Sequence, residues 1–288
     1  MNITFLGTAA ANAYPEAFCN CDNCIQARLL GGPSLRKRSA ALINDDLLID
    51  LGPDIMAAAQ IHNCPLTHVK FCLQTHPHAD HLDLSHLLSR SPDYGVVGAP
   101  CLHFYASPQT LQRAALAFIR DLSDEELLLP STQQHLNLQI HAITPLQPFK
   151  VGRYRVTAFP ANHAEGMGAM LYAIECDGCC IFYATDTAAL FEETWHAFQQ
   201  LNCKFDLVIL DHTYGPNQAS GGDHLNAQQF IAHVARMRSE GILASQARVF
   251  ATHIAHEGNP PHPSLAAFAQ QHGYEVAYDG LRVGLLVE

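Results

Sequence analysis

The sequence predicts a single α/β domain that spans residues 1–288. A chain of this length can bury a large core within one domain of that class. Continuous apolar runs, such as 205–210, are typical of strands that are covered on both faces. Other stretches have helical spacing, as Leu84, Leu87 and Leu88 do. Strands and helices that follow one another along the chain indicate the α/β class.

Composition and charge restrict the function. Hydrophobic residues make up 48% of the chain and charged residues 15%, as in a compact globular protein. No apolar run reaches the roughly 18 residues that a membrane span needs, and the N-terminus lacks the basic start of a signal peptide. We therefore expect a cytoplasmic protein without a membrane partner. The formal net charge of −11 opposes the binding of large nucleic acids, which depends on Lys and Arg neutralising phosphate.

Strands are expected where apolar residues alternate or form short runs. Ile3 and Phe5 alternate with polar residues, which predicts a strand over 2–7. Turn residues predict two hairpins, one of 39–43 with 47–51 around residues 44–46, and one of 170–175 with 179–184 around Asp177-Gly178. The other expected strands are 69–73, 156–159, 205–210, 248–252 and a closing segment over 275–287.

Helices are expected over 81–89, 111–129, 227–237 and 263–272. Ser107-Pro108 is a favourable N-cap and first-turn pair, and we expect the stretch 111–129 to form one or two helices that end at Pro130. The segment near 106–135 is interpreted as a helical insertion that forms a lid or a dimer face, which leaves a homodimer open. A Gly-rich loop over 220–226 precedes the third helix.

The sequence THPHADH, residues 75–81, places four metal-competent side chains after an apolar strand. Residues i and i+2 of an extended segment project from one face, so His76 and His78 can converge on one ion. Asp80 and His81 begin the next turn and point at a second ion. Imidazole and carboxylate suit Zn, Mn or Fe, and two ions about 3.5–4 Å apart can activate a water. The alternative is a His-rich surface loop in a chain with 18 His, which the complete HxHxDH spacing disfavours.

A second cluster, Cys19, Cys21 and Cys24 in FCNCDNC, lies in the loop after the first strand. Three thiols within six residues are too crowded to form disulfides with good geometry. In a chain without an export signal, ten Cys are better explained as metal ligands or buried residues. A tetrahedral zinc with a distant fourth ligand is therefore expected. The alternatives are free thiols and a redox site, and the CxCxxC pattern disfavours the latter.

THPHADH resembles the metal signature of the metallo-β-lactamase fold superfamily. The CxCxxC loop is similar to the structural-zinc loop of the PhnP-type phosphodiesterases and PqqB-type proteins in that superfamily. The resemblance implies a four-layer αββα sandwich, two active-site divalent ions, Zn or Mn, and one structural Zn. The implied ligands are His76, His78 and His163 for one ion, Asp80, His81 and His253 for the other, Asp186 as the bridge between them, and Cys19, Cys21, Cys24 and His256 for the structural zinc.

The resemblance also implies catalytic roles. The segment DHLN, with His224, is similar to the one that supplies a substrate-facing His in the PhnP-type enzymes, so His224 is expected to protonate the leaving oxygen. Asp80 is the second expected catalytic residue, through the ion it holds. His212 is a rival proton donor, and Asp186 has the alternative role of capping a helix that follows it. Asp50, at a strand end, is expected to orient a ligand His.

Other conspicuous residues are expected to be structural. The basic run 36–38 is interpreted as a solvated turn rather than a phosphate contact. Cys176, Cys179 and Cys180 are interpreted as buried or turn residues rather than metal ligands. His86 is expected to pack against neighbours or to lie on the surface rather than to bind metal.

The predicted function is that of a dinuclear metal-dependent hydrolase, most consistent with a phosphodiesterase for small phosphodiesters, cyclic ones included. One alternative is a PqqB-like role in cofactor biosynthesis. A second is a tRNA 3′-end processing nuclease, which the acid excess disfavours. A third is a metal-binding protein without catalysis.

Overall fold

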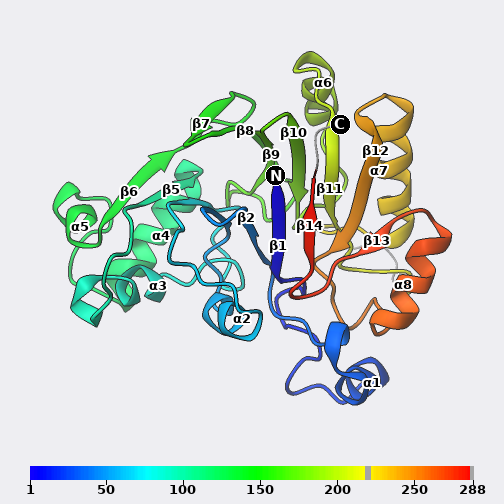
Figure 1. The fold of residues 1–288 in the computed structure, drawn as a ribbon, viewed down its shortest axis with the longest axis horizontal. Helices are drawn as coiled ribbons and strands as arrows, with labels where there is room; N and C mark the ends of the chain where they lie inside the picture. Colours follow the sequence, from blue (N-terminus) through cyan, green and yellow to red (C-terminus); the bar gives the residue numbers. More distant parts are fainter. Residues whose placement is uncertain (218–221, 286–288) are drawn as a thin grey trace.

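Two seven-stranded sheets lie face to face in the computed structural model, which describes residues 1–217 and 222–285 (Figure 1). The first sheet has the order β14-β1-β2-β3-β4-β5-β6 and the second the order β13-β12-β11-β10-β9-β8-β7. The strands of the first sheet are β1 (Asn2–Gly7), β2 (Ala40–Ile43), β3 (Leu47–Ile49), β4 (Phe71–Leu73), β5 (Leu102–Ala106), β6 (Leu138–Ala142) and β14 (Arg282–Gly284). Those of the second are β7 (Phe149–Val151), β8 (Tyr154–Pro160), β9 (Met170–Cys176), β10 (Cys179–Ala184), β11 (Phe205–Asp211), β12 (Leu243–Thr252) and β13 (Glu275–Val276).

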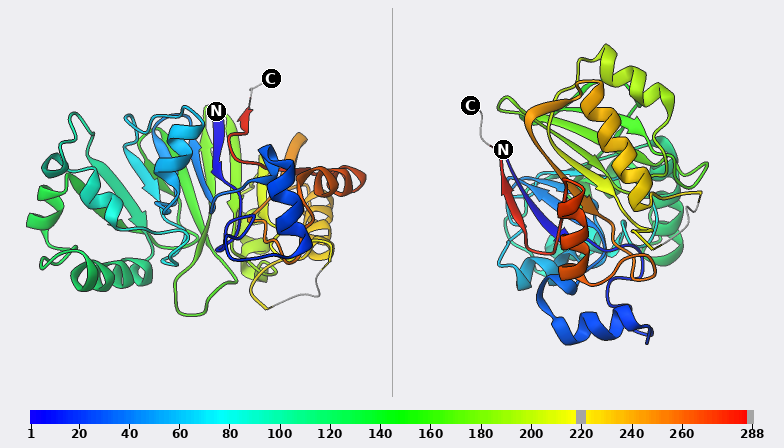
Figure 2. Two further views of the ribbon diagram at one scale, coloured as in Figure 1. Left: turned by 90° about the horizontal axis from the view of Figure 1, so that it is seen from below. Right: turned by 90° about the vertical axis from the view of Figure 1, so that its right-hand side faces the viewer.

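Helices flank the two sheets on their outer sides, with α4 and α5 at one end of the molecule and α6, α7 and α8 at the other (Figures 1 and 2). Helix α1 lies apart from both sheets (Figure 1). The helices are α1 (Asp22–Leu30), α2 (Ile55–Ile61), α3 (Ser85–Ser89), α4 (Pro108–Asp121), α5 (Pro130–His135), α6 (Glu192–Gln200), α7 (Ala227–Ser239) and α8 (His262–Gln271). None of the helices among the described residues is long and apolar enough to cross a membrane.

Three hydrophobic clusters separate four layers. The middle cluster joins the sheets, with Phe5 of β1 and Tyr172 of β9 both buried in it. One outer cluster packs helices such as α4, through Phe118, onto the first sheet. The other packs α6 and α7 onto the second sheet, through residues such as Trp195 and Phe230. Because each sheet is covered on both faces, the predicted αββα sandwich is confirmed.

The expected strands form where the sequence predicts them, except that the strand expected over 248–252 begins already at Leu243. Both hairpins are antiparallel pairs, β2 with β3 and β9 with β10. Strand β11 is parallel to both of its neighbours, β10 and β12. It is almost wholly buried, which explains its continuous apolar sequence.

Three other predicted boundaries are wrong. The helix expected over 111–129 ends at Asp121, and Pro130 begins α5 instead of ending a helix, because Pro lacks an N–H and suits the first helical turn. The helix expected over 81–89 covers only Ser85–Ser89. The closing segment divides: β13 pairs with β12 and β14 with β1, in different sheets. Positions 220 and 221 of the expected Gly-rich loop, and 286 and 287 of the closing segment, lie outside the described residues.

The basic run 36–38 is not a solvated turn. Arg36 is 3% exposed and donates to the Thr8 hydroxyl at 2.7 Å and to the Ala277 carbonyl. Arg38 forms a two-pronged ion pair with Asp54. Through Arg36 this run connects the end of the N-terminal strand to the C-terminal segment. Its positive charges therefore form contacts within the fold, with partners so distant in the sequence that no local pattern indicates them.

Candidate active site and structural metal cluster

The expected active-site residues come from loops at one edge of the two sheets. Strands β8, β10, β11 and β12 all run in the same direction, so their carboxyl ends meet at this edge, where ligands bind in open α/β sheets. His163 follows β8, Asp186 follows β10 and His253 follows β12. The THPHADH loop follows β4 of the facing sheet.

Two groups of side chains converge there. In the first group, His76 Nε2 lies 2.9 Å from His78 Nδ1, and His163 Nε2 lies 3.3 Å from the same atom. The second group consists of Asp80, His81, Asp186 and His253, whose candidate ligand atoms all lie within 4.8 Å of one another. Every metal-ligating residue predicted for the active site therefore lies in one of these two groups.

Asp186 lies between the groups. Its Oδ2 is 3.0 Å from His81 Nε2 and 3.2 Å from His253 Nε2. Its Oδ1 is 3.7 Å from His163 Nε2, in the first group. Each carboxylate oxygen thus faces a different group, which is the geometry that a bridging ligand needs. The alternative role as a helix cap is wrong, because the next helix begins only at Glu192.

The donor atoms fit divalent metal ions. Asp186 Oδ2, His81 Nε2 and His253 Nε2 are buried and have no hydrogen-bond partner among the described residues. The opposite ring nitrogens are held in place: His81 Nδ1 lies 2.7 Å from Asp50 Oδ2, and His253 Nδ1 lies 2.7 Å from Thr213 Oγ1. Such outer partners orient imidazoles toward a metal. Buried, unpartnered nitrogen and oxygen atoms aimed at one point suit Zn, Mn or Fe.

Burial and neighbouring charges suit these side chains to ligand roles. Burial, and then the nearby His81, lower the pKa of His76, which keeps its imidazole in the neutral form that binds metals. Burial opposes the charge on Asp186, but His253 and His81 outweigh it and lower the pKa of the carboxyl. His76 therefore presents a neutral ring in the first group, and the bridge presents a negative charge.

A further imidazole lies beside the two groups. His224 Nδ1 is 2.8 Å from Asp211 Oδ2, and the His224 ring stacks on the His253 ring with centroids 5.2 Å apart. Burial disfavours the charged ring, but the Asp211 carboxylate outweighs burial and raises the pKa of His224 to about 9. Asp211 is fully buried and also accepts from the Thr213 N–H at 2.9 Å.

The rival His212 lies elsewhere. It is fully buried, with Nδ1 2.9 Å from Asn259 Oδ1 and Nε2 2.9 Å from the Tyr274 hydroxyl. The sequence did not indicate that Asp211 and Thr213 are partners of the site. The only available signal was their place at the end of β11, beside other strand-end residues.

A cavity of about 540 Å³ opens onto both groups and His224. The loop of residues 10–13 forms one wall, and Tyr214, Asp223 and Glu257 form another. Tyr214 donates to Asp223 Oδ1 at 2.7 Å. No Lys or Arg is among the described residues that line the cavity.

The Cys loop forms a separate cluster. Ligand atoms of Cys19, Cys21, Cys24 and His256 all lie within 4.8 Å of one another, as a tetrahedral zinc site requires. Burial opposes the thiolate of Cys21, but the Cys24 N–H and the His256 ring lower its pKa to about 7. Cys21 also caps helix α1, which the sequence analysis did not predict. His256 lies three residues beyond His253, so one loop connects this cluster to the active site.

The three Cys near the hairpin turn at Asp177-Gly178 lie as expected. Cys176, Cys179 and Cys180 are buried on the paired strands β9 and β10, and no metal-ligating group among the described residues includes them.

Comparisons with known proteins agree with this geometry. Residues 46–254 match the family described as "Beta-lactamase superfamily domain". A diphosphatase from the PhnP family has a similar structure, with a TM-score of 0.73, 19% identity and coverage of 99% of this chain and 98% of that chain. The structure of Zn(2+)-bound PqqB from Methylobacterium extorquens has a TM-score of 0.73 and 20% identity, with coverage of 99% of this chain and 100% of that chain. The short form of human tRNase Z has a TM-score of 0.66 and 18% identity, with coverage of 100% of both chains. No curated protein sequence matches the chain.

The family match covers well over half of the chain, and the two structures with the highest of these TM-scores are of the kinds that the Cys loop resembles. The identities are low, so these structures show a shared fold. The superfamily and its clustered His and Asp side chains are those of a metal-dependent hydrolase. From these observations we conclude that the chain belongs to the beta-lactamase superfamily and has the metallo-β-lactamase fold.

Proposed function

We propose that the protein is a divalent-metal-dependent phosphodiesterase that acts on small phosphodiesters, cyclic ones included. One observation carries the proposal: an imidazole held by a buried carboxylate, His224 with Asp211, faces the same cavity as the two metal-ligating groups. Such a site combines places for two cations with a proton donor for a leaving group.

The residues that would hold the ions are those brought together by the structure. One ion would be held by His76, His78 and His163, and the other by Asp80, His81 and His253. Asp186 would bind both ions. Divalent ions at these positions would polarise a phosphoryl oxygen and lower the pKa of a water, which is the chemistry that ester hydrolysis needs. Asp50 and Thr213 hold the remote nitrogens of His81 and His253, so those rings stay oriented before substrate arrives.

His224 would supply the proton for the leaving group. Its Nδ1–H donates to Asp211, so Nε2 is the ring nitrogen that is left to exchange a proton with a bound molecule. As the phosphorus–oxygen bond to the leaving group breaks, the Nε2 proton passes to that oxygen, and the ring returns to its neutral form. Asp211 keeps the ring in one tautomer and orientation throughout.

The cavity suits a singly charged substrate. Asp223 and Glu257 are acidic, and no Lys or Arg among the described residues lines the wall. A phosphodiester carries one negative charge, whereas a phosphomonoester carries nearly two at neutral pH. The extra charge would lie near these acidic side chains, and no Lys or Arg among the described lining residues would balance it. The proposal therefore predicts preference for diesters over monoesters.

The test is hydrolysis by metal-replete protein. Bis(p-nitrophenyl) phosphate and a 2′,3′-cyclic nucleotide are compared with p-nitrophenyl phosphate, and bound metal is measured in the same samples. Asp80→Ala should lose metal and turnover. His224→Ala should keep metal and lose about 10²–10⁴-fold in kcat. His272→Ala, which changes an exposed imidazole at the end of α8, is the matched control and should keep full activity.

Full turnover by His224→Ala would refute the proton-donor role. Absence of diester hydrolysis in fully metallated wild-type protein would refute the phosphodiesterase proposal as a whole.

The second candidate function is a PqqB-like role. It is supported by the TM-score of the PqqB structure, which equals that of the diphosphatase, and by the Cys cluster. It predicts metal binding with weak or no diester turnover. A tRNA-processing role is disfavoured by the net charge of −11.

A further inference from the structure

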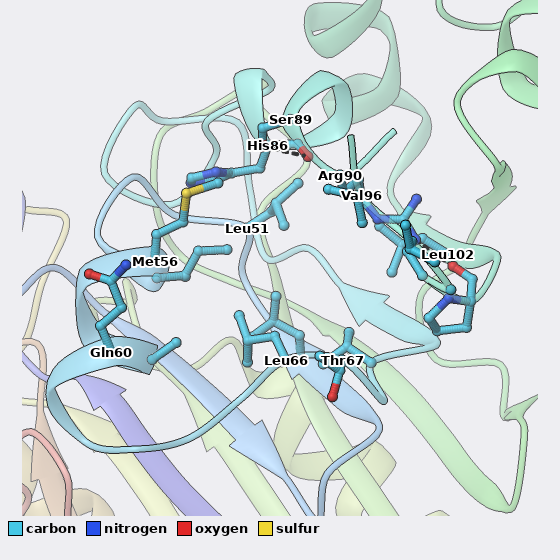
Figure 3. A pocket seen from close by; sticks show the side chains of 18 residues that line it. Leu51, Met56, Gln60, Leu66, Thr67, His86, Ser89, Arg90, Val96 and Leu102 are labelled. Atoms are coloured by element: carbon cyan, nitrogen blue, oxygen red, sulfur yellow. Dashed lines mark hydrogen bonds between the residues drawn. The ribbon is translucent and has the colours of Figure 1, made fainter. Parts of the chain in front are cut away.

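A second cavity, of about 400 Å³, lies on the outer side of the first sheet, away from the metal-ligating groups. Figure 3 shows side chains from α2, α3, the strand ends and the loop before β5 arranged around a common space. The wall is mainly aliphatic, and its buried part includes Leu48, Leu51, Ile55, Val69 and Leu102.

The cavity exists because the outer helical layer is incomplete there. Helix α3 has only five residues, and the chain then leaves the sheet in a loop with Gly95 and Gly98, both at positive φ. Helix α2 covers the sheet on one side of the gap. At the mouth, Met56 is 47% exposed and Val97 is 95% exposed. An apolar space is thus left open to solvent on one side.

One buried polar atom of a residue in the wall has no hydrogen-bond partner among the described residues. His86 is 6% exposed, and its Nε2 lies 3.0 Å from the Gly52 carbonyl oxygen. A carbonyl can only accept, so Nε2 carries the hydrogen and Nδ1 of the neutral ring is an acceptor. Nδ1 is buried and has no hydrogen-bond partner among the described residues. Leaving such an acceptor unsatisfied destabilises the folded protein. A ligand with a donor would remove that destabilisation.

A guanidinium in the wall, that of Arg90, is already hydrogen-bonded. Arg90 donates to the carbonyls of Leu136 and Asn137 at 3.2 and 3.1 Å, and also to that of Pro100. It therefore fastens the loop before β5. No Asp or Glu is among the described residues that line the cavity. The wall offers an apolar surface and one free acceptor, which favours an uncharged ligand with a donor.

We propose that this cavity binds a small aliphatic molecule that carries one hydrogen-bond donor, such as an alkyl alcohol or amide, with the donor on His86 Nδ1 and the chain against the aliphatic wall. The volume is within the range of small-molecule sites, roughly 300–1,000 Å³. The proposal does not depend on the phosphodiesterase activity, because the site shares no residue with the metal-ligating groups.

The first experiment tests the place of binding. 1-Hexanol is titrated into the full-length protein, and binding is followed by saturation-transfer NMR and calorimetry. Ala59→Trp fills the cavity from α2 and should abolish binding. Ala57→Trp, which places the same side chain on the exposed part of the same helix outside the cavity, should leave the Kd unchanged. Failure of 1-hexanol to bind wild-type protein, or equal binding by both variants, would overturn the proposal.

The second experiment tests the polar contact. The methyl ether of 1-hexanol has the same chain but no donor, and it should bind wild-type protein about tenfold more weakly, the loss of one net hydrogen bond. His86→Leu should remove this difference. Equal affinity of wild-type protein for the alcohol and the ether would overturn the assignment even if His86→Leu did not fold.

Sedimentation of wild type and Ala59→Trp tests whether the cavity is instead a contact between copies of the chain. Self-association that only Ala59→Trp abolishes would refute the ligand proposal.

Discussion

At the scale of single residues, two buried carboxylates organise the candidate active site. Asp50 is fully buried, lies 2.7 Å from His81 Nδ1, and also accepts from the Thr75 hydroxyl and backbone N–H. Asp211 holds His224 in the same way. Neither carboxylate belongs to the two metal-ligating groups of the active site. Each instead fixes the tautomer and orientation of an imidazole that is expected to do the chemistry.

Replacing Asp50 should weaken metal binding. In Asp50→Asn the partner of His81 loses its charge, and we expect metal affinity to fall about 10–100-fold. Competition with a fluorescent chelator measures the change. Asp54→Asn is a suitable control, because Asp54 pairs with Arg38 outside the metal groups. Equal affinities for wild type and Asp50→Asn would show that Asp50 serves only the fold.

Replacing Asp211 should slow catalysis while metal remains bound. Asp211→Asn removes the carboxylate that orients His224, so kcat for a diester should fall toward that of His224→Ala. The double variant Asp211→Asn/His224→Ala should then be no slower than His224→Ala alone, because the two residues act as one unit. Independent, multiplying losses in this double-mutant cycle would contradict the pairing.

At the scale of elements, strand ends determine where the functional side chains lie. Asp50, Asp186 and His253 follow β3, β10 and β12, and each has positive φ, at 66°, 54° and 58°. Such a backbone costs about 1–3 kcal/mol at a non-Gly residue and is found where the surrounding structure imposes it, often at functional sites. Here it turns the chain sharply as each strand ends at the shared edge. The Cys loop before α1 is a different kind of element, because the ligand atoms of its three Cys converge on a distant residue, His256.

Loss of one Cys should loosen that element. Cys21→Ser removes a ligand of the proposed structural zinc and replaces the cap of α1. We expect the loss of one equivalent of zinc and a fall in Tm of roughly 4–8 °C, which corresponds to about 2 kcal/mol in a chain of this size. Cys101→Ser, at a partly exposed Cys outside the cluster, should change neither value. Unchanged zinc content in Cys21→Ser would argue for free thiols.

At the scale of the whole molecule, the two ends of the chain close the sandwich together. The C-terminal segment contributes β13 to the second sheet and β14 to the first, so it crosses between the sheets at the turn with Asp279. Asp279 accepts from the Lys37 N–H at 2.6 Å and from the Thr8 hydroxyl at 2.8 Å. Burial is the main influence on this carboxyl and raises its pKa to about 6, although Lys37 and Arg36 act in the opposite direction.

This shift predicts a pH dependence of stability. The folded protein holds the Asp279 proton up to about pH 6, whereas the unfolded chain releases it near pH 4. The contribution of the Asp279 proton to the free energy of unfolding is therefore fully present below about pH 4. It is lost as the pH rises toward 6, by roughly 3 kcal/mol in total. Denaturant unfolding should show that the wild type loses stability relative to Asp279→Asn over this interval. An opposite or flat difference would contradict the raised pKa.

Much of the fold could be predicted because its signals are local. Alternation in Ile3 and Phe5, the turn Asp177-Gly178 and the apolar run 205–210 all specify strands through neighbouring residues alone. The helix boundaries were less predictable, because a Pro can either follow the end of one helix or begin another. In the structure Pro130 begins α5. The buried position of Arg36 depends on Ala277 and Thr8, both far from it in sequence, so no local pattern could reveal it.

The sequence by itself determined the chemistry of this protein: THPHADH and FCNCDNC place imidazole, carboxylate and thiol groups at spacings that suit metals, and their likeness to a known superfamily pointed to the more distant partners. Only the tertiary structure decided how these groups meet. Asp186 faces both His groups because β10 ends between β8 and β12, and Asp211 reaches His224 across a loop. The physical reason is that spacing along the chain fixes contacts only over a few residues, whereas contacts between strand ends depend on which strands pair and in which direction.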